Sequence, residues 1–362
     1  MKSNYKPLGK YIQPVVGRNN DLGDLPLMGL SIQKMFIPSI ANTIGTDMST
    51  YRTIYKNQFA FGPVTSRNGD KITIALFNDY DKALISQAYI PFEVKDNNEL
   101  DTEYLMMWFR RPEFDRYARF KSHGSAREIF DWEEMCNTLL PVPHIAKQRE
   151  IVKEYNVIQN RIALNQQLIQ KLEETAQAIY KQWFVEGINL EDLPEGWRKG
   201  TLEDLYKFQY GIGNTNPNNG GQYPIYGAGG VIGGFDEYNS EDAPVIGHMG
   251  EYCGKVVFAF GKHFVTYNGV KCLAKNESLK WFSYLTLLSK DLMSNTRGSS
   301  QPFVSYDMLY ESETVLPNDE MALNFDVLAK KIFKQINFKQ LENQKLSELK
   351  DLLLSKLATI EN

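Results

Sequence analysis

The sequence predicts a mixed α/β fold with two globular domains that have β-rich cores, each followed by a long helix. Two observations predict it: an internal repeat with a long period, and an amphipathic helical pattern that closes each half. We expect globular domains at 1–143 and 188–317, and coiled-coil helices at 144–187 and 318–362. Each helix leaves one globular domain and heads for the other, so the two should run antiparallel in a pseudo-two-fold molecule.

The residues that lead into the two helices match at a constant shift. Before the first helix stand Gly124-Ser125 and then Leu140-Pro141-Val142-Pro143; before the second stand Gly298-Ser299-Ser300 and then Val315-Leu316-Pro317. The shift in position is the same at both ends of the stretch, since 298 − 124 = 174 and 317 − 143 = 174. This agreement indicates two copies of one domain exit.

The first helical segment carries a heptad seam, in which apolar residues alternate four and three apart over about four heptads. The seam runs through Ile151, Tyr155, Ile158, Ile162, Asn165, Ile169 and Leu172. A polar residue such as Asn165 at a seam position fixes register and orientation at some cost in stability. The alternative is a surface helix that happens to carry one Asn.

The second helical segment matches the first less well. Moving the seam forward by the difference between positions 151 and 328 predicts a second seam at Leu328, Ile332, Leu346, Leu349 and Leu353. The middle of this segment is polar, and Ile336, Phe338 and Leu341 lie beside the polar stretch. We therefore expect the apolar stripe to shift there, as it does at a stutter.

Composition narrows the class of protein. A chain of 362 residues with 43% hydrophobic residues is long enough for two or three globular domains. The N-terminal stretch is polar and no apolar run could cross a bilayer, so neither a signal peptide nor a membrane span is expected. The three widely spaced cysteines, Cys136, Cys253 and Cys272, suggest reduced thiols in a cytoplasmic protein.

The net charge of −4 is unevenly distributed. Residues 1–143 carry 17 basic and 17 acidic side chains, whereas residues 188–317 carry 10 and 15. Nucleic-acid binding would therefore need local patches or a partner that supplies positive charge. One local patch comprises Arg110, Arg111, Arg116, Arg119, Lys121, His123 and Arg127. A solvated helix face is the alternative interpretation of that patch.

Motifs for catalysis are mostly missing. There is no Gly-rich loop ending in Gly-Lys-Ser/Thr, and no Asn-Pro-Pro-Tyr or Asp-Pro-Pro-Tyr of an amino-group methyltransferase. Asp81 with Glu93-Val94-Lys95 has only the bare spacing of a nuclease metal site. The four histidines are too scattered to share a metal. The glycine clusters sit among aromatic and β-branched residues, which favours tight turns in a β-rich domain.

The second half carries a family resemblance. It contains, in order, Leu193-Pro194-Glu195-Gly196-Trp197, Tyr223-Pro224-Ile225-Tyr226-Gly227-Ala228-Gly229-Gly230, Gly250-Glu251-Tyr252-Cys253-Gly254-Lys255 and Ser299-Ser300-Gln301-Pro302. These motifs resemble a target recognition domain of type I restriction-modification specificity subunits. The first half, with Leu30-Ser31, Phe36-Ile37-Pro38-Ser39 and Phe59-Ala60-Phe61, is similar to another branch of the same domain type.

The resemblance implies a DNA-binding specificity subunit that reads a bipartite target with two recognition domains and does no chemistry itself. No catalytic residue, metal site or cofactor is therefore expected on this chain. The implied partners are two methyltransferase subunits, which use S-adenosylmethionine to methylate adenine, and restriction subunits, which use ATP with Mg²⁺. Two separated half-sites need a stiff spacer, and about 40 helical residues give a rod on the order of 60 Å.

Base readout needs exposed side chains that donate or accept two hydrogen bonds, chiefly Arg, Lys, Asn and Gln. The candidates in the first half are Lys34, Arg67, Asn68, Lys71, Lys121 and Arg127. Those in the second half are Asn214, Asn216, Asn218, His248, Arg297 and Gln301. Asn68-Gly69-Asp70 lies between two apolar strand-like runs and is also interpreted as a hairpin turn.

Two other classes of protein remain open. One is a coiled-coil adaptor that binds proteins and reads no DNA, which the acidic balance of 188–317 favours slightly. The other is a self-contained restriction-methylation enzyme, which the missing methyltransferase motif opposes.

Overall fold

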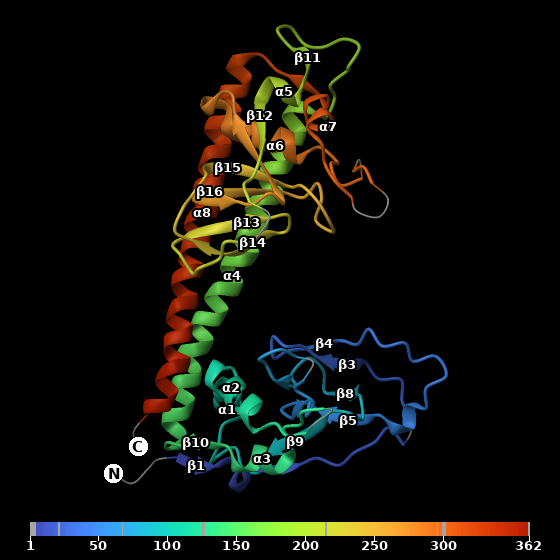
Figure 1. Ribbon diagram of the computed structural model, residues 1–362, viewed down its shortest axis with the longest axis vertical. Coiled ribbons are helices and arrows are strands. Elements are labelled where there is room, and N and C mark those ends of the chain that lie inside the picture. The colour runs from blue at the N-terminus through green and yellow to red at the C-terminus, as the bar shows by residue number, and fades with distance from the viewer. Residues whose placement is uncertain are drawn as a thin grey trace. The chain divides into compact units, whose positions relative to one another are not determined.

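The chain forms two compact units, which share the two long helices (Figure 1). The first unit comprises Met1–Ala163 and Gln344–Asn362, and the second comprises Leu164–Asn343. The computed structural model describes residues 5–20, 22–66, 68–124, 127–213, 216–294, 296–298 and 302–360.

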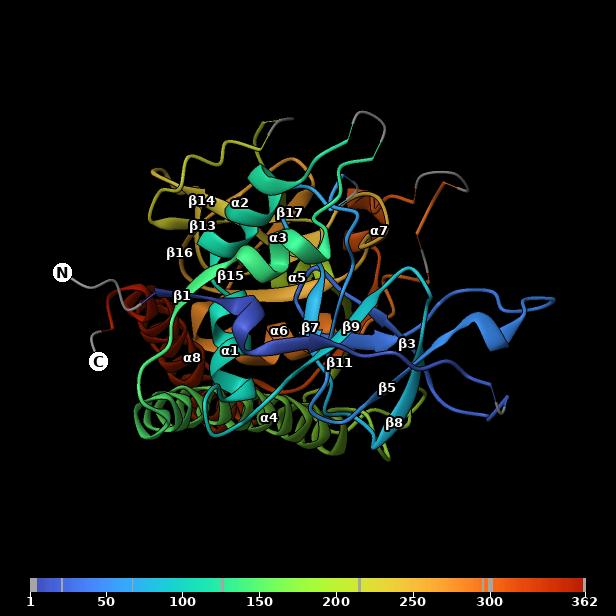
Figure 2. The ribbon, with the colours of Figure 1, turned by 90° about the horizontal axis from the view of Figure 1, so that it is seen from below.

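The first unit contains three small sheets and three short helices. The strands are β1 (Tyr5–Pro7), β2 (Ile12–Pro14), β3 (Leu27–Leu30), β4 (Phe36–Pro38), β5 (Arg52–Tyr55), β6 (Phe59–Phe61), β7 (Ile74–Leu76), β8 (Lys82–Ile85), β9 (Ile90–Val94) and β10 (Leu139–Pro141). The helices are α1 (Thr102–Phe109), α2 (Pro112–Lys121) and α3 (Trp132–Asn137). The sheet orders are β2-β9-β6-β7, β4-β3-β8-β5 and β1-β10. Figure 2 shows β5 beside β8, with which it pairs antiparallel.

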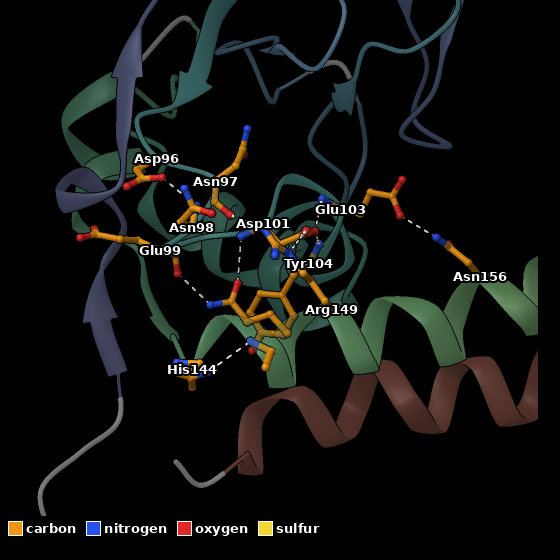
Figure 3. A network of polar contacts seen from close by, with 12 residues as sticks. Asp96, Asn97, Asn98, Glu99, Asp101, Glu103, Tyr104, His144, Arg149 and Asn156 are labelled. Carbon is orange, nitrogen blue, oxygen red and sulfur yellow. Dashed lines mark hydrogen bonds and ion pairs between the residues drawn. The ribbon is translucent and has the colours of Figure 1, made fainter.

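An aromatic cluster forms the main core of the first unit. The rings of Phe59 and Phe92 stack with centroids 5.0 Å apart, and Phe109 of α1 meets the Phe59 ring edge-on at 5.8 Å. Every residue of α1 from Tyr104 to Phe109 is buried. This helix begins at Asp101, whose carboxylate accepts hydrogen bonds from the backbone N–H groups of Glu103 and Tyr104 (Figure 3). The buried strands and the capped helix together create the core that holds the surface loops.

The second unit is built on one larger sheet. Its strands are β11 (Arg198–Thr201), β12 (Tyr206–Tyr210), β13 (Tyr223–Gly227), β14 (Gly230–Phe235), β15 (Ser240–Gly247), β16 (Val256–Val265), β17 (Gly269–Ala274) and β18 (Glu313–Leu316). Its helices are α5 (Leu202–Leu205), α6 (Lys280–Leu288) and α7 (Tyr306–Tyr310). The six-stranded sheet has the order β12-β17-β15-β16-β13-β14, and β11 pairs separately with β18. All pairs are antiparallel except β13 with β16.

The long helices are α4 (Ile145–Phe184) and α8 (Asp319–Lys356). Within the second unit they lie side by side and antiparallel (Figure 1). The Tyr180 ring, near the end of α4, lies 5.9 Å from the Phe325 ring near the start of α8. Further back along α4, Asn165 donates a hydrogen bond of 2.9 Å to Asn343. The later residue of α4 therefore contacts the earlier residue of α8, as the predicted antiparallel arrangement requires.

The seam residues of α4 face inward at the predicted positions, with Ile151, Tyr155, Ile158 and Asn165 buried. Ile162, Ile169 and Leu172 are half-buried. The buried amide of Asn165 donates its hydrogen bond to Asn343, so it has a polar partner within the seam.

The seam predicted for α8 is wrong at two of its five positions. Leu328 is 36% exposed and Leu349 is 45% exposed, while Ala322, Phe325, Ala329 and Ile336 are buried. Of the other predicted members, Ile332, Leu346 and Leu353 are half-buried. The buried face of α8 instead follows Ala322, Phe325, Ala329, Phe333 and Ile336, which join the core of the second unit, and Leu328 lies one position off that face.

The two units repeat one frame. The pair β1–β10 corresponds to β11–β18, the pair β2–β9 to β12–β17, and α1 and α3 to α6 and α7. One hydrogen bond shows the match: Leu8 N–H donates to Thr138 O at 2.8 Å, and Leu202 N–H donates to Ser312 O at 2.9 Å. The positions of Thr138 and Ser312 differ by the shift found at the domain exits (312 − 138 = 174). The sheet β4-β3-β8-β5 corresponds to the neighbouring strands β14-β13-β16-β15, since in both sets the middle pair is parallel and the outer pairs are antiparallel. The helix α2 has no counterpart of this kind among the described residues of the second unit.

Each unit also joins a short helix to a long one at equivalent places. In the first unit, Gln148 of α4 accepts from Asp101 N–H at 2.9 Å and donates to the carbonyls of Glu99 and Pro143, each at 2.8 Å. Asn156, further along α4, donates to the Glu103 carboxylate of α1 (Figure 3). In the second unit, Asp326 of α8 accepts from the N–H groups of Trp281 and Phe282 at 2.6 and 3.1 Å.

None of the helices in the described parts of the chain has the length and apolar character needed to span a bilayer.

Candidate nucleic-acid interface

A β-bridge between His123 and Ile129 closes a short hairpin in the first unit just before α3. His123 and Ile129 exchange backbone hydrogen bonds of 3.0 and 2.9 Å, which close the hairpin at its base. A neighbouring segment holds it on the outside: Thr65 N–H donates to Glu128 O at 3.0 Å, and Phe130 N–H donates to Pro63 O at 2.8 Å. We call residues 123–129 the first hairpin.

The second unit builds the same hairpin just before α7. Arg297 and Phe303 exchange backbone hydrogen bonds of 3.0 and 2.8 Å. Gly250 N–H donates to Pro302 O at 3.1 Å, and Val304 N–H donates to His248 O at 3.0 Å. We call residues 297–303 the second hairpin. Every hairpin residue in these bonds is shifted by 174 from its counterpart (297 − 123 and 303 − 129), and the supporting residues by 185 (250 − 65 and 248 − 63).

A glycine with positive φ follows the first closing residue in both hairpins. Gly124 has φ +129° and Gly298 has φ +90°, a region that L-residues rarely adopt. At Gly124 a Cβ atom would also lie 2.2 Å from the Arg127 carbonyl oxygen. The same backbone conformation therefore opens both hairpins, while the residues that follow the two glycines differ in sequence. Ser125, Ala126, Ser299, Ser300 and the candidate Gln301 lie outside the described residues.

Two of the candidate readers flank these tips. Arg127 is exposed on the first hairpin. Arg297 opens the second hairpin with its side chain 56% exposed, and its guanidinium lies 2.8 Å from the Asp307 carboxylate. Lys121, just before the first hairpin, is half-buried and lies 3.3 Å from Glu134. Of these three, Arg127 is the candidate whose described contacts leave its head group most open.

Lys34 does not fit its predicted role as an exposed reader. It is 6% exposed, and its ammonium lies 2.8 Å from the Asp115 carboxylate of α2 and donates to the Phe109 carbonyl. Burial lowers the pKa of Lys34, while the hydrogen bond and charge of Asp115 oppose that shift. Its positive φ of +61° and these contacts make it a latch between the β3–β4 turn and the helices α1 and α2.

Most arginines of the basic patch predicted from the sequence contact other residues of the first unit. The Arg110 guanidinium lies over the Tyr155 ring, and that of Arg111 lies 4.3 Å from the Trp108 ring centroid. Arg119 pairs with Glu128 of the first hairpin. The side chain of Arg116 is 68% exposed and lies 3.3 Å from Glu113. Arg116 and Arg127 are therefore the outward-facing arginines of the patch.

The Asn68-Gly69-Asp70 turn belongs to a longer connection than a tight hairpin. Strands β6 and β7 pair antiparallel, but residues 62–73 join them. Asn68 donates through its side chain to Val64 O at 3.1 Å, so its amide closes the turn. Lys71 follows in an exposed position, and Arg67 lies outside the described residues.

The asparagines of the second unit mainly shape their own loop. Asn218 accepts from the backbone N–H groups of Gly220 and Gly234 at 3.2 and 3.0 Å. Asn216 accepts from Asn218 N–H at 3.1 Å and donates to Ile232 O at 3.4 Å. Both side chains are exposed, but their hydrogen bonds stabilise the loop itself. Asn214 lies outside the described residues.

His248 is buried, contrary to its proposed place on an exposed loop. Its ring stacks on Tyr210 with centroids 4.3 Å apart, and Tyr210 stacks in turn on Tyr306 at 4.1 Å. The His248 carbonyl supports the second hairpin. His248 is therefore a support for the hairpin base.

Sequence reasoning missed Phe120, which is 81% exposed at the end of α2. A signal was present: Arg116 and Phe120 are four residues apart, so they share one helix face, and Phe114 and Ala118 occupy the buried face. Within the described ranges, no group of three or more His, Cys, Asp or Glu side chains is placed to hold a metal ion.

Comparison with known proteins follows the same twofold pattern. The sequence matches the Type I restriction modification DNA specificity domain over residues 2–174 and 194–351. A curated relative, the Type I restriction enzyme HindI specificity subunit of Haemophilus influenzae, is 25% identical over 137 residues, which make up 37% of this chain and 29% of that protein. This match spans less than a third of that relative's length.

A solved structure shares the fold along nearly the whole chain. The S subunit of a type I restriction-modification system from M. genitalium superposes with a TM-score of 0.59 at 17% identity, covering 99% of this chain and 96% of that one. At this identity the likeness concerns the fold, and it confirms the mixed α/β architecture with two sheet-rich domains and long helices. The family match covers most of the sequence in two blocks, so the chain belongs to the type I restriction-modification DNA specificity family.

Proposed function

We propose that this chain is the specificity subunit of a type I restriction-modification complex, which reads a bipartite DNA target and contributes no chemistry of its own. The observation that carries the proposal is the pair of equivalent hairpins. One backbone frame occurs twice in a chain of this family, while the tips and their flanking charges differ. A protein that reads two unlike half-sites needs this combination of constant support and variable contact.

Each unit would contact one half-site through its hairpin and the neighbouring loops. In the first unit Arg127 and the adjoining α2 surface supply positive charge, which the DNA backbone attracts. In the second unit the hairpin carries Arg297, paired with Asp307. An exposed ion pair of this kind is weak and can exchange for a phosphate or base contact. The acidic balance of 188–317 makes that half more dependent on a partner for positive charge.

The outer face of α8 supports docking of partner subunits. In the second unit Leu323, Val327, Phe338 and Leu341 are 41–59% exposed and lie within about 60° of one another around the helix axis. Apolar side chains aligned on one exposed helix face are typical of a helix-in-groove or helix-pair contact. We assign this stripe to methyltransferase subunits, two per chain, which would bind S-adenosylmethionine. Restriction subunits with ATP and Mg²⁺ would complete the complex in the cytoplasm.

A methylation-resolved genome sequence with and without the gene tests the proposal. We expect loss of one bipartite adenine motif when the gene is deleted, and its return when the gene is restored. Restoring the gene with Gly298→Val, which forces a side chain into a positive-φ position at the second hairpin, should abolish the whole motif because both half-sites are required. An unchanged methylome in a cell with active methyltransferase would refute the assignment.

An adaptor without sequence readout is the second candidate, and the exposed α8 stripe together with the acidic second unit favours it. An electrophoretic mobility shift with the chain and its methyltransferase separates the two. The specificity subunit should retard one duplex over its scrambled counterpart, with affinity that falls as salt rises. Binding that is insensitive to both sequence and salt would support the adaptor.

A further inference from the structure

A surface hollow of about 540 Å³ lies beside α2 in the first unit, and no residue of the second unit lines it. Its walls are formed by Asp70, Lys71, Pro112, Asp115, Arg116, Arg119 and Phe120. The hollow adjoins the first hairpin through Arg119, which lines the hollow and pairs with Glu128 of the hairpin. We call it the α2 hollow.

The loop that carries Lys71 is fixed beside α2. Asp115 accepts from Ile72 N–H at 3.1 Å, and the same carboxylate is paired with buried Lys34 at 2.8 Å. The buried ammonium of Lys34 therefore balances the charge of Asp115, and this carboxylate does not cancel the cations at the rim of the hollow. Lys71 and Arg116 remain as exposed positive side chains in the lining. Arg116 is paired with exposed Glu113 at 3.3 Å, and exposed Asp70 also lines the hollow.

Phe120 gives the rim a second chemical character. A phenylalanine that is 81% exposed at the end of a helix, four residues after an exposed arginine, contributes nothing to the core of its own unit. Sugars and base edges of DNA offer apolar surface directly beside the phosphates. In proteins that bind single strands, cations that follow the backbone stand beside aromatic rings that stack on bases. In a duplex the bases are already stacked, so the ring of Phe120 would meet a sugar instead.

We propose that the α2 hollow binds a phosphodiester group of the DNA read by the first hairpin, with Lys71 and Arg116 on the phosphate and Phe120 against the adjoining sugar. The inference rests on the proposed function and deepens it, because phosphate contacts fix the register from which a reader meets the bases. Since α2 has no counterpart among the described residues of the second unit, the two half-sites are gripped unequally. The first unit supplies a dedicated backbone contact.

Binding of the full-length chain to a mixed-sequence DNA duplex of about 30 base pairs, measured by fluorescence anisotropy across a salt series, tests the inference. Lys71→Ala and Arg116→Ala should each weaken binding and reduce the salt slope by about 1, and the double variant by about 2. Phe120→Ala should weaken binding several-fold with the slope unchanged. Glu113→Gln should strengthen binding, because it frees Arg116 from its acidic neighbour.

Lys56→Ala is the matched control, since Lys56 is exposed in the same unit but precedes β6, whereas Lys71 lies in the connection that follows it. It should leave affinity and slope unchanged. Equal slopes for Lys71→Ala, Arg116→Ala and the unaltered chain would overturn the inference, as would an equal loss in Lys56→Ala or no binding by the unaltered chain at low salt. If the variants keep the salt slope of the unaltered chain while the bipartite methylome is intact, the proposed role of the α2 hollow is refuted and the specificity function is not.

Discussion

The two units attach a short helix to a long helix at the same place, but with different chemistry. Gln148 and Asp326 are related by the same shift in position as Thr102 and Lys280, the first residues of α1 and α6 (326 − 148 = 280 − 102). The neutral amide of Gln148 accepts one hydrogen bond from a backbone N–H group and donates two to backbone carbonyls. The carboxylate of Asp326 accepts hydrogen bonds from two backbone N–H groups. The frame therefore conserves the position of a buried polar contact, and leaves its charge free to differ.

Breaking the latch between Lys34 and Asp115 in the first unit should have the largest effect. Lys34→Met leaves the Asp115 carboxylate buried without its cation, and we expect a loss of about 3–5 kcal/mol in unfolding free energy. Hydrogen exchange read by mass spectrometry should place the loss in the first unit. The double variant Lys34→Met/Asp115→Asn, which removes both charges, should recover part of it. A single variant as stable as the unaltered chain would show that the latch is dispensable.

Removing the neutral contact that Gln148 makes in the first unit should have the next largest effect on stability. Gln148 is fully buried, and Gln148→Ala removes partners from one N–H and two carbonyl groups, which predicts a loss of about 2–3 kcal/mol. The loss should be the same at every pH between 4 and 8, because an amide does not titrate in that range. A chemical denaturation series at several pH values measures it. A pH-dependent loss would contradict the comparison with Asp326.

The charged joint of the second unit should instead depend on pH. Burial raises the pKa of Asp326, with the hydrogen bonds from Phe282 and Trp281 opposing it. Between the unfolded pKa, about 3.9, and the higher folded pKa the native state holds more protons. The Asp326 contribution is therefore complete below about pH 3.9 and declines as pH rises through the folded value. Asp326→Ala should cost about 1–3 kcal/mol, since it leaves two buried N–H groups unpaired.

Asp326→Asn isolates the titration, because it keeps an acceptor and removes the charge. Relative to Asp326→Asn, the unaltered chain should be most stable at low pH and lose that advantage as pH rises. A constant difference between the two proteins from pH 4 to 7 would refute the raised pKa.

The seam pair should give the smallest effect, and one of opposite sign. Replacing both Asn165 and Asn343 by Leu exchanges a polar contact for apolar packing, and should raise the melting temperature of the second unit by about 2–4 °C. Calorimetry of the double variant checks the direction. Asn165→Leu alone leaves Asn343 without its seam partner, and should give a smaller gain or a loss. A lower melting temperature for the double variant would mean that the pair contributes net stability.

The repeat and the helices were predictable from the sequence because they depend on local periodicity and on residues at fixed spacing. The error in the α8 seam has a physical cause. Ala322 and Ala329 occupy inward positions, and alanine gives no stronger hydrophobic signal than the outward Leu328. A seam extrapolated from α4 selects Leu328, whereas the buried face of α8 continues from Phe325 to Ala329 and Phe333.

The candidate readers were harder to predict, since burial is set by contacts between distant residues. Lys34 resembles any turn lysine until Asp115 is placed beneath it. His248 looks like a loop residue until Tyr210 and Tyr306 form a stack against it. The hairpins were visible in the sequence only as a shared glycine, because the supporting segments at 63–65 and 248–250 follow a different shift.

The exposed stripe on α8 has a consequence for how much of this protein a cell can hold. Leu323, Val327, Phe338 and Leu341 face water whenever no partner covers them. Uncovered apolar faces of this kind promote self-association and mark a chain for proteolysis. We therefore expect the abundance of the chain to follow that of its partner, with surplus copies removed, so that its stoichiometry is set by turnover as well as by synthesis.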